Sequence, residues 1–188
     1  MPMRTPAKAQ PAGSERRERL HPLHGSEKHP LPGSKIVRRV HHRKELSVTV
    51  ILRRRRVRGQ RSLQALSHRR PKRMGDREFI AKYGAEPEDI RRMRRFARGN
   101  HLAIEEINRA RRSVILSGSA KYFESAFGVR LYHHSYPATI RKTAPPAGKE
   151  KHYRTFEGPV HVPMYLAGRV LGVFGLDNRR LSRPNVNS

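Results

Sequence analysis

The segment from residue 45 to residue 53 constrains the fold most strongly. Apolar side chains occupy every second position in it, at Leu46, Val48, Val50 and Leu52. That two-residue period predicts a β-strand with one face in a core and one face outside it. An arginine-rich run at 53–58 follows directly, and its position favours the solvent-facing exit of the strand as much as a binding motif.

Downstream of this strand, helical and extended patterns follow in a defined order. We expect helices near 76–84, 87–99 and 120–127, and strands near 101–107, 111–117, 129–133 and 170–176, with extended chain at 153–156 and 160–163 and a short turn at 164–168. The Pro-, Lys- and Gly-rich stretch 137–151 is predicted to be a loop. No internal repeat is present.

Residues that commonly begin or end helices predict the helix boundaries. Asp76 and Ser119 are N-cap candidates, Pro87 suits a first helical position, and Gly84 and Gly128 suit helix C-termini. Four phenylalanines are predicted to lie in the core: Phe123, Phe127, Phe156 and Phe174. Tyr132 and Tyr136 suit either the core or the rim of an interface.

This order of elements predicts an α+β sandwich, in which an antiparallel sheet carries helices on one face. We place that domain at 45–178, which is long enough for one modest core. Residues 1–44 are predicted to be a basic, Pro- and His-rich arm that is extended or disordered, because residues 1–19 lack periodicity and Pro and Gly interrupt 20–33 too often for regular structure.

Charge sets a second constraint. The 188 residues contain 42 Lys and Arg against 15 Asp and Glu, for a formal net charge of +27, and residues 1–75 carry +17 of it. A solvated basic surface is one reading of this excess. Binding of nucleic acid through the arginine-rich region 1–75 is the alternative hypothesis, since such a charge favours phosphate contacts.

Several site classes find no support in the sequence. Cysteine is absent, so disulfides, thiolate metal sites and cysteine nucleophiles are excluded. No window is apolar enough to suggest a membrane span, and residues 1–20 lack the apolar stretch of a secretory signal peptide, which leaves the localisation open. We expect no metal at the pairs His41-His42 or His133-His134, because adjacent residues of an extended chain point to opposite faces.

The eleven histidines leave two interpretations open. They gain charge between about pH 5 and 7 and could form an acid switch. Alternatively, those of the N-terminal arm are merely exposed, at His21, His24, His29, His41 and His42.

Six segments in a fixed order carry a family resemblance. They read PLHGSEKHPLPGS at 22–34, LSVTVILRRR at 46–55, REFIAKYGAEPEDI at 77–90, ARRSVILSGSAKYFESAFGVRL at 110–131, YRTFEGPVHVP at 153–163 and VLGVFGLDNR at 170–179. The chain thereby resembles the N-terminal activation domain, or prodomain, of the sedolisin family of serine-carboxyl peptidases, and its kumamolisin-like members above all. It departs from them in the basic segments 37–44 and 57–75, the first of which is usually acidic.

The resemblance implies a ferredoxin-like sandwich similar to subtilisin propeptides. It also implies a module that assists folding of the peptidase and inhibits it until acid releases it, so that the implied partner is a sedolisin-type catalytic domain. Residues 179–188 correspond to the linker that leads through the cleft of the enzyme. The implied cleft-occupying or processing residues are Arg179, Arg180, Leu181, Ser182 and Arg183.

No catalytic site is expected on this chain. In the family that the chain resembles, the catalytic Ser, Glu and Asp lie in the domain after the linker. The sequence Leu116-Ser117-Gly118-Ser119 looks superficially like a nucleophile turn, but a capping serine is the better interpretation. The three aspartates are assigned to a helix cap (Asp76), a helix first turn (Asp89) and a strand end (Asp177). We therefore expect no peptide hydrolysis and no cofactor.

Overall fold

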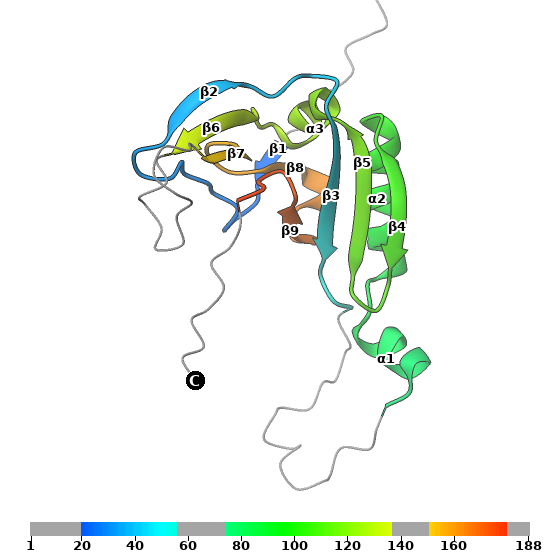
Figure 1. The fold of residues 1–188 in the computed structure, drawn as a ribbon. Helices are drawn as coiled ribbons and strands as arrows, with labels where there is room; N and C mark the ends of the chain where they lie inside the picture. Colours follow the sequence, from blue (N-terminus) through cyan, green and yellow to red (C-terminus); the bar gives the residue numbers. More distant parts are fainter. Residues whose placement is uncertain (1–19, 56–73, 137–150, 180–188) are drawn as a thin grey trace, which may run out of the picture.

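The structure is a computed structural model that describes residues 20–55, 74–136 and 151–179. Its centre is a four-stranded antiparallel sheet in the order β4-β5-β3-β9 (Figure 1). The strands are β3 (Glu45–Leu52), β4 (Ala103–Asn108), β5 (Ser113–Ser119) and β9 (Val170–Phe174). The helices are α1 (Asp76–Tyr83), α2 (Pro87–Gly99) and α3 (Ala120–Phe127).

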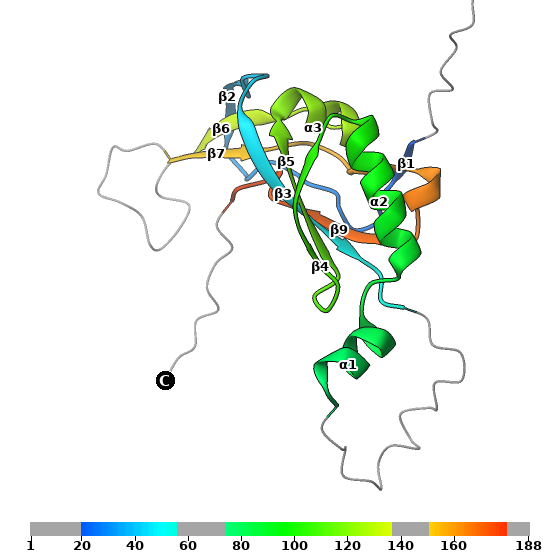
Figure 2. The same cartoon turned by 90° about the vertical axis from the view of Figure 1, so that its right-hand side faces the viewer.

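The chain order β3-α2-β4-β5-α3-β9 gives the predicted ferredoxin-like sandwich, an α+β fold. Helices α2 and α3 lie on the same face of the sheet (Figure 2), where Phe96 and Phe127 meet with ring centroids 5.4 Å apart. The alternation in β3 has the predicted effect, since Leu46, Val48 and Val50 are all buried against these helices.

Helix ends follow the sequence signals in part. Pro87 is the first residue of α2, and Gly128 ends α3 with a left-handed φ of 61°, where its N–H donates to the Glu124 carbonyl. Asp76 is the first helical residue of α1 and Gly75 is its N-cap, so the cap prediction for Asp76 is wrong. Ser119 occupies the N-cap position of α3 without a side-chain capping bond.

A second group of strands packs beside the central sheet. The strands β2 (Lys35–Arg39), β6 (Tyr132–Tyr136) and β7 (Lys151–Thr155) form one antiparallel sheet in the order β2-β6-β7. The strand β1 (Leu20–Pro22) pairs with β8 (His161–Pro163), which a short 3-10 turn, η3 (Met164–Leu166), follows.

These pairings revise the predicted N-terminal arm. Residues 20–44 are extended, as expected, but they belong to the folded domain through β1 and β2. Leu23 and Val40 are buried in the core, and the Leu23 N–H donates to the Val160 carbonyl. Residues 1–19 and the predicted loop residues 137–150 lie outside the described part.

Candidate docking site

The central sheet has one face that no helix of the described structure covers, and we call it the helix-free face. Its outward positions follow from the strand register and alternate with the buried ones: Ser47, Thr49, Ile51, Glu106, Asn108, Ser113, Ile115, Ser117, Gly172 and Phe174. None of these positions is Lys or Arg, although 42 of the 188 residues are. The positive charge therefore avoids this surface.

Thr49 lies at the centre of the helix-free face. It pairs with Ile115 of β5 on one side and with Phe174 of β9 on the other. Thr49 thus has an apolar side chain on each side and no charged one beside it in these two pairs. Interface cores are likewise depleted in charged residues.

Phe174 is the largest side chain on this face, and its predicted core position is wrong. It is 60% exposed, whereas Phe123, Phe127 and Phe156 are buried as predicted. The reason is the register of β9, which turns Val173 toward the core and Phe174 away from it. The Phe174 ring lies over Gly172, where any β-carbon would come within 2.7 Å of the ring.

A pair of carboxylates borders the helix-free face at the edge strand β4. The Ser47 hydroxyl donates to Glu105, and the Asn108 amide donates to Glu106, at 3.3 and 3.4 Å. Both glutamates are exposed and have no ion pair among the described residues. This edge is therefore negative in a strongly positive protein.

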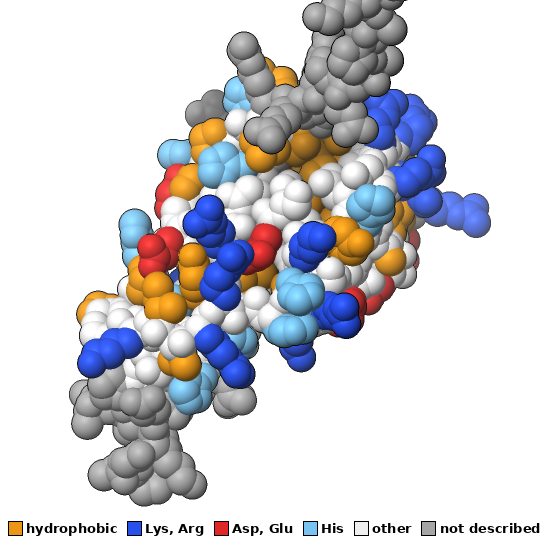
Figure 3. Space-filling view, turned by 90° about the horizontal axis from the view of Figure 1, so that it is seen from above, with side chains coloured by type: hydrophobic (Ala, Val, Ile, Leu, Met, Phe, Trp, Pro, Cys, Tyr) orange, Lys and Arg blue, Asp and Glu red, His pale blue; other side chains and the backbone are white. Residues whose placement is uncertain are grey.

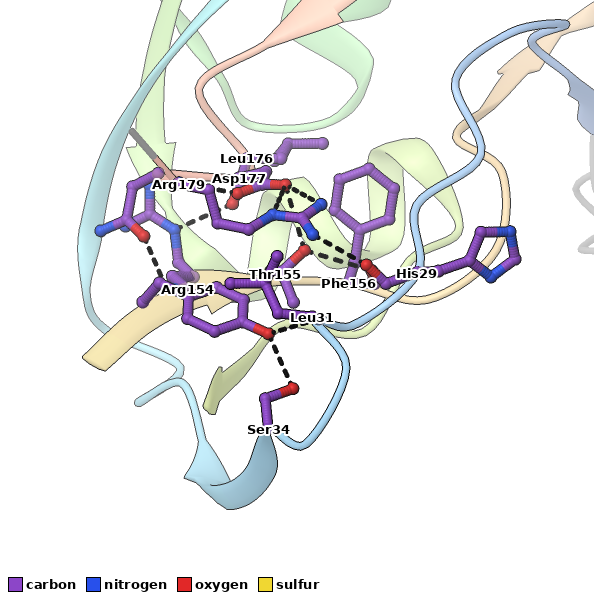
Figure 4. A network of polar contacts seen from close by, with 11 residues as sticks. His29, Leu31, Ser34, Arg154, Thr155, Phe156, Leu176, Asp177 and Arg179 are labelled. Carbon is purple, nitrogen blue, oxygen red and sulfur yellow. Dashed lines mark hydrogen bonds and ion pairs between the residues drawn. The ribbon is translucent and has the colours of Figure 1, made fainter. Parts of the chain in front are cut away.

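The C-terminal end of β9 is the second part of the site, because the chain leaves the domain there. Gly175 turns the chain with φ 103°, and a β-carbon at Gly175 would come within 2.6 Å of the Ser47 carbonyl oxygen. Asp177 then accepts hydrogen bonds from the Arg179 backbone and guanidinium and from the Thr155 hydroxyl (Figure 4). Arg179 also donates to the His29 carbonyl, at 2.8 Å.

Side chains of strand β7 also contact the segment that follows β9. Arg154 donates to the carbonyls of Leu176 and Gly175, and burial lowers its pKa while Asp177 opposes that shift. Tyr153 donates to the Ser34 hydroxyl, and the centroid of its ring lies 5.6 Å from the Arg179 guanidinium carbon. The exit thus joins β7, β9 and the loop before β2. We call residues 175–179 the strand exit.

The structure places one of the five predicted tail residues. Arg179 is fixed at the strand exit, whereas Arg180, Leu181, Ser182 and Arg183 lie outside the described residues. The sequence predicts Asp177 at a strand end, whereas β9 ends at Phe174 and Asp177 lies three residues beyond it. The pairing of Asp177 with Arg179 was not predicted. The spacing Asp-x-Arg directly after a predicted strand was the available signal.

Sequence reasoning also missed a buried ion cluster on the helix-covered side. Asp89 lies in the first turn of α2, as predicted. It is fully buried there, which the sequence does not predict, and it pairs with two arginines. Arg53 donates to one carboxylate oxygen at 2.9 Å and Arg169 to the other. This cluster ties the end of β3 and the start of β9 to α2, and its role is structural.

Basic residues gather elsewhere on the molecule. Figure 3 looks onto the end formed by β2, β6 and α3 and shows Lys and Arg side chains spread over it. A hollow of about 420 Å³ is lined there by Arg38, Arg39, His41, Lys44 and His133. The solvent side of α2 carries exposed arginines around a second hollow of about 460 Å³, at Arg91, Arg94, Arg95 and Arg98.

Two further features were sought in the described part of the chain, a cluster of metal-ligating side chains and a membrane-spanning helix. The His, Asp and Glu residues of this part nowhere form a group of three suited to a metal ion. The rings of His41 and His42 stack on each other at 4.5 Å. In the same described ranges, no helix has both the length and the apolar character to cross a membrane.

Comparison with known proteins identifies the family. The family model described as "Pro-kumamolisin, activation domain" matches residues 32–179. This chain belongs to the pro-kumamolisin activation domain family. A curated relative, kumamolisin from Bacillus sp. (strain MN-32), is 32% identical over 145 residues, which cover 74% of this chain and 24% of the relative. The chain thus spans about a quarter of that relative.

The match confirms the resemblance to sedolisin prodomains, and it includes both parts of the site, the helix-free face and the strand exit. The alternative prediction, nucleic-acid binding through residues 1–75, receives no support from these comparisons. Residues 1–19 and 56–73 of that region lie outside the described structure.

Proposed function

We propose that this chain is a peptidase activation module that docks on the catalytic domain of a sedolisin-type serine-carboxyl peptidase. It would assist the folding of that domain and inhibit it while bound. The observation that carries the proposal is the helix-free face, which presents Ile115 and Phe174 on either side of Thr49 and lacks Lys and Arg in a chain of net charge +27.

The chemistry of the helix-free face suits a protein partner. Interface cores are depleted in Lys and enriched in aromatic residues, and a few central anchors carry most of the binding energy. Phe174 is the aromatic anchor that this face offers, with Ile51 on the neighbouring strand β3 and Ile115 on β5 beyond it. Glu105 and Glu106 at the edge favour a partner with a cationic group facing β4.

The strand exit would direct the tail into the cleft of the partner. Asp177, Tyr153 and the His29 carbonyl hold Arg179 in place, so the residues that follow start from a fixed point on the domain. Arg180, Leu181, Ser182 and Arg183 would then occupy or approach the cleft, as linkers of this kind require. The chain itself would hydrolyse no peptide bond in this scheme.

The test is inhibition of a catalytic domain supplied in trans. The purified chain is titrated against the mature catalytic domain of a kumamolisin-type peptidase near neutral pH, and the inhibition constant is measured. Thr49→Arg places a cation at the centre of the helix-free face without touching the core, so we expect the inhibition constant to rise at least about tenfold.

Thr49→Val is the matched control, because it keeps the β-branched shape and adds no charge; it should inhibit as well as the wild type. Absence of inhibition by the folded wild-type chain would refute the proposal. Equal inhibition by the Arg and Val variants would refute the helix-free face as the docking surface.

A further inference from the structure

His134 is the most deeply buried titratable ring of the described structure, and nothing in the docking scheme uses it. It lies in β6, opposite Ile36 of β2 and Tyr153 of β7, with 1% of its surface exposed. Within the described residues, neither ring nitrogen has a hydrogen-bond partner. One nitrogen of a neutral imidazole carries a proton and both do in imidazolium, so protonation would add a second buried donor without an acceptor.

The surroundings of His134 offer little to stabilise a positive charge. Its ring stacks on Tyr153 with centroids 5.3 Å apart, and the Tyr153 hydroxyl is already engaged with Ser34 and with the Leu31 N–H. Of the charged groups around it, Glu157 favours the charged ring from an exposed position and Arg179 opposes it. Burial is the dominant influence and lowers the pKa of His134 below its ordinary value.

Neighbouring strands add no further counter-charge. On β2, Arg38 faces His133 rather than His134, and on β7, Arg154 also lies opposite His133. Burial and then Arg38 lower the pKa of His133 as well, so both histidines of β6 resist protonation in the folded sheet. His134 differs from His133 in two ways. It is fully buried, and its ring stacks on Tyr153, against which the Arg179 guanidinium lies.

We propose that His134 is an acid-operated release point, whose protonation opens the β2-β6-β7 sheet and frees the strand exit. The physical link is Tyr153, which stacks on His134, lies against the Arg179 guanidinium and bonds the loop before β2. An imidazolium at position 134 must reach water to be solvated. That movement removes the Tyr153 ring from its place and with it one of the contacts that hold Arg179.

The direction of the pH effect follows from linkage. A histidine whose pKa is lower in the folded than in the unfolded protein takes up a proton on opening as soon as the pH falls below about 6.5. The stability of the closed sheet is complete above that pH and declines below it. The opening constant rises by up to about tenfold at pH 5.5, and it stops rising once the pH passes below the folded pKa.

The physiological meaning of this release rests on the proposed function, but its test does not. Hydrogen exchange, corrected for the intrinsic pH dependence, is measured on the isolated full chain at pH 7.5 and 5.5. We expect the amides of β2, β6 and β7 and of residues 176–179 to open up to about tenfold more at pH 5.5, with β3 and β5 changing less. His134→Phe should reduce this pH response to the smaller part that the less buried His133 contributes, since the ring and its stack are kept and the proton site of His134 is lost.

His152→Phe is the matched control, because His152 lies in β7 of the same sheet but is exposed; it should keep the wild-type response. A change below twofold in the wild type, or an unchanged response in His134→Phe, would overturn the proposal. If His134→Phe fails to fold, the wild-type His134 ring is titrated by NMR. A midpoint at or above 6.5, or titration without opening of the sheet, would equally overturn it.

The two proposals fail separately. Loss of the pH response leaves inhibition by the helix-free face intact. Loss of inhibition in trans leaves the exchange result unchanged, because no peptidase is present in that experiment.

Discussion

The two faces of the central sheet carry opposite chemistry. The helix-covered side ends in the solvent surface of α2, where Arg91, Arg94, Arg95 and Arg98 are exposed together. The helix-free face has no Lys or Arg and presents Phe174 and Ile115 around Thr49. A general need for solubility would place charge on both faces. Positive charge is instead missing from the helix-free face, which carries Glu106, and the proposed docking on that face would explain this asymmetry.

The largest difference between the faces should appear in the paired variants Phe123→Ala and Phe174→Ala. Phe123 is fully buried in α3, so its truncation should lower the free energy of unfolding by about 4 kcal/mol. Phe174 is mostly exposed, so its truncation should cost less than about 1 kcal/mol while weakening inhibition in trans. Urea unfolding followed by circular dichroism gives both values.

Comparable losses of stability in the two variants would mean that Phe174 is a core residue after all and that the distinction between the faces is wrong. Retained inhibition by a folded Phe174→Ala variant would remove the aromatic anchor from the docking proposal.

The second largest effect on stability is expected at the two arginines that bind a buried carboxylate. Arg53 and Arg169 reach inward because the buried Asp89 carboxylate binds one with each oxygen. Asp89→Asn removes that charge and leaves two guanidinium groups facing a neutral amide, so we expect a loss of about 3 kcal/mol in unfolding free energy. The estimate is at the low end for a broken buried pair, because both arginines are partly exposed and retain contact with water.

Unfolding in urea at pH 7 measures this loss. Asp76→Asn, which alters an exposed aspartate at the start of α1, is the control and should change the stability little. A loss below about 1 kcal/mol for Asp89→Asn would show that the cluster is not what ties β3 and β9 to α2.

The sequence predicted the structure well where the residue pattern within a single strand or helix determines which side chains are buried. The alternation in β3 predicted both its buried residues and its outward ones, including Thr49 at the centre of the candidate site. In α2, Ile90, Met93 and Ala97 recur at the spacing of one helix face, and all three are buried. In these elements the local period and the tertiary packing agree.

The sequence was misleading where a distant partner decides the structure. Strands β1 and β2 have three and five residues, and pair with strands more than 90 residues away, so no local period announces them. Phe174 is apolar and large, which favours a core position, yet the register of β9 against β3 turns it outward. The Asp89 cluster needs arginines 36 and 80 residues away.

The smallest expected effect tests the basic side of the comparison. Arg94 and Arg98 are exposed, lie four residues apart on α2, and have no ion pair among the described residues. Like charges at that spacing repel, so Arg94→Gln with Arg98→Gln should leave the stability unchanged or raise it by up to about 0.5 kcal/mol at low salt. Inhibition in trans should stay at the wild-type level, because this surface faces away from the proposed docking face. A tenfold loss of inhibition in this double variant, with the fold intact, would move the docking surface to α2 and reverse the assignment of the two faces.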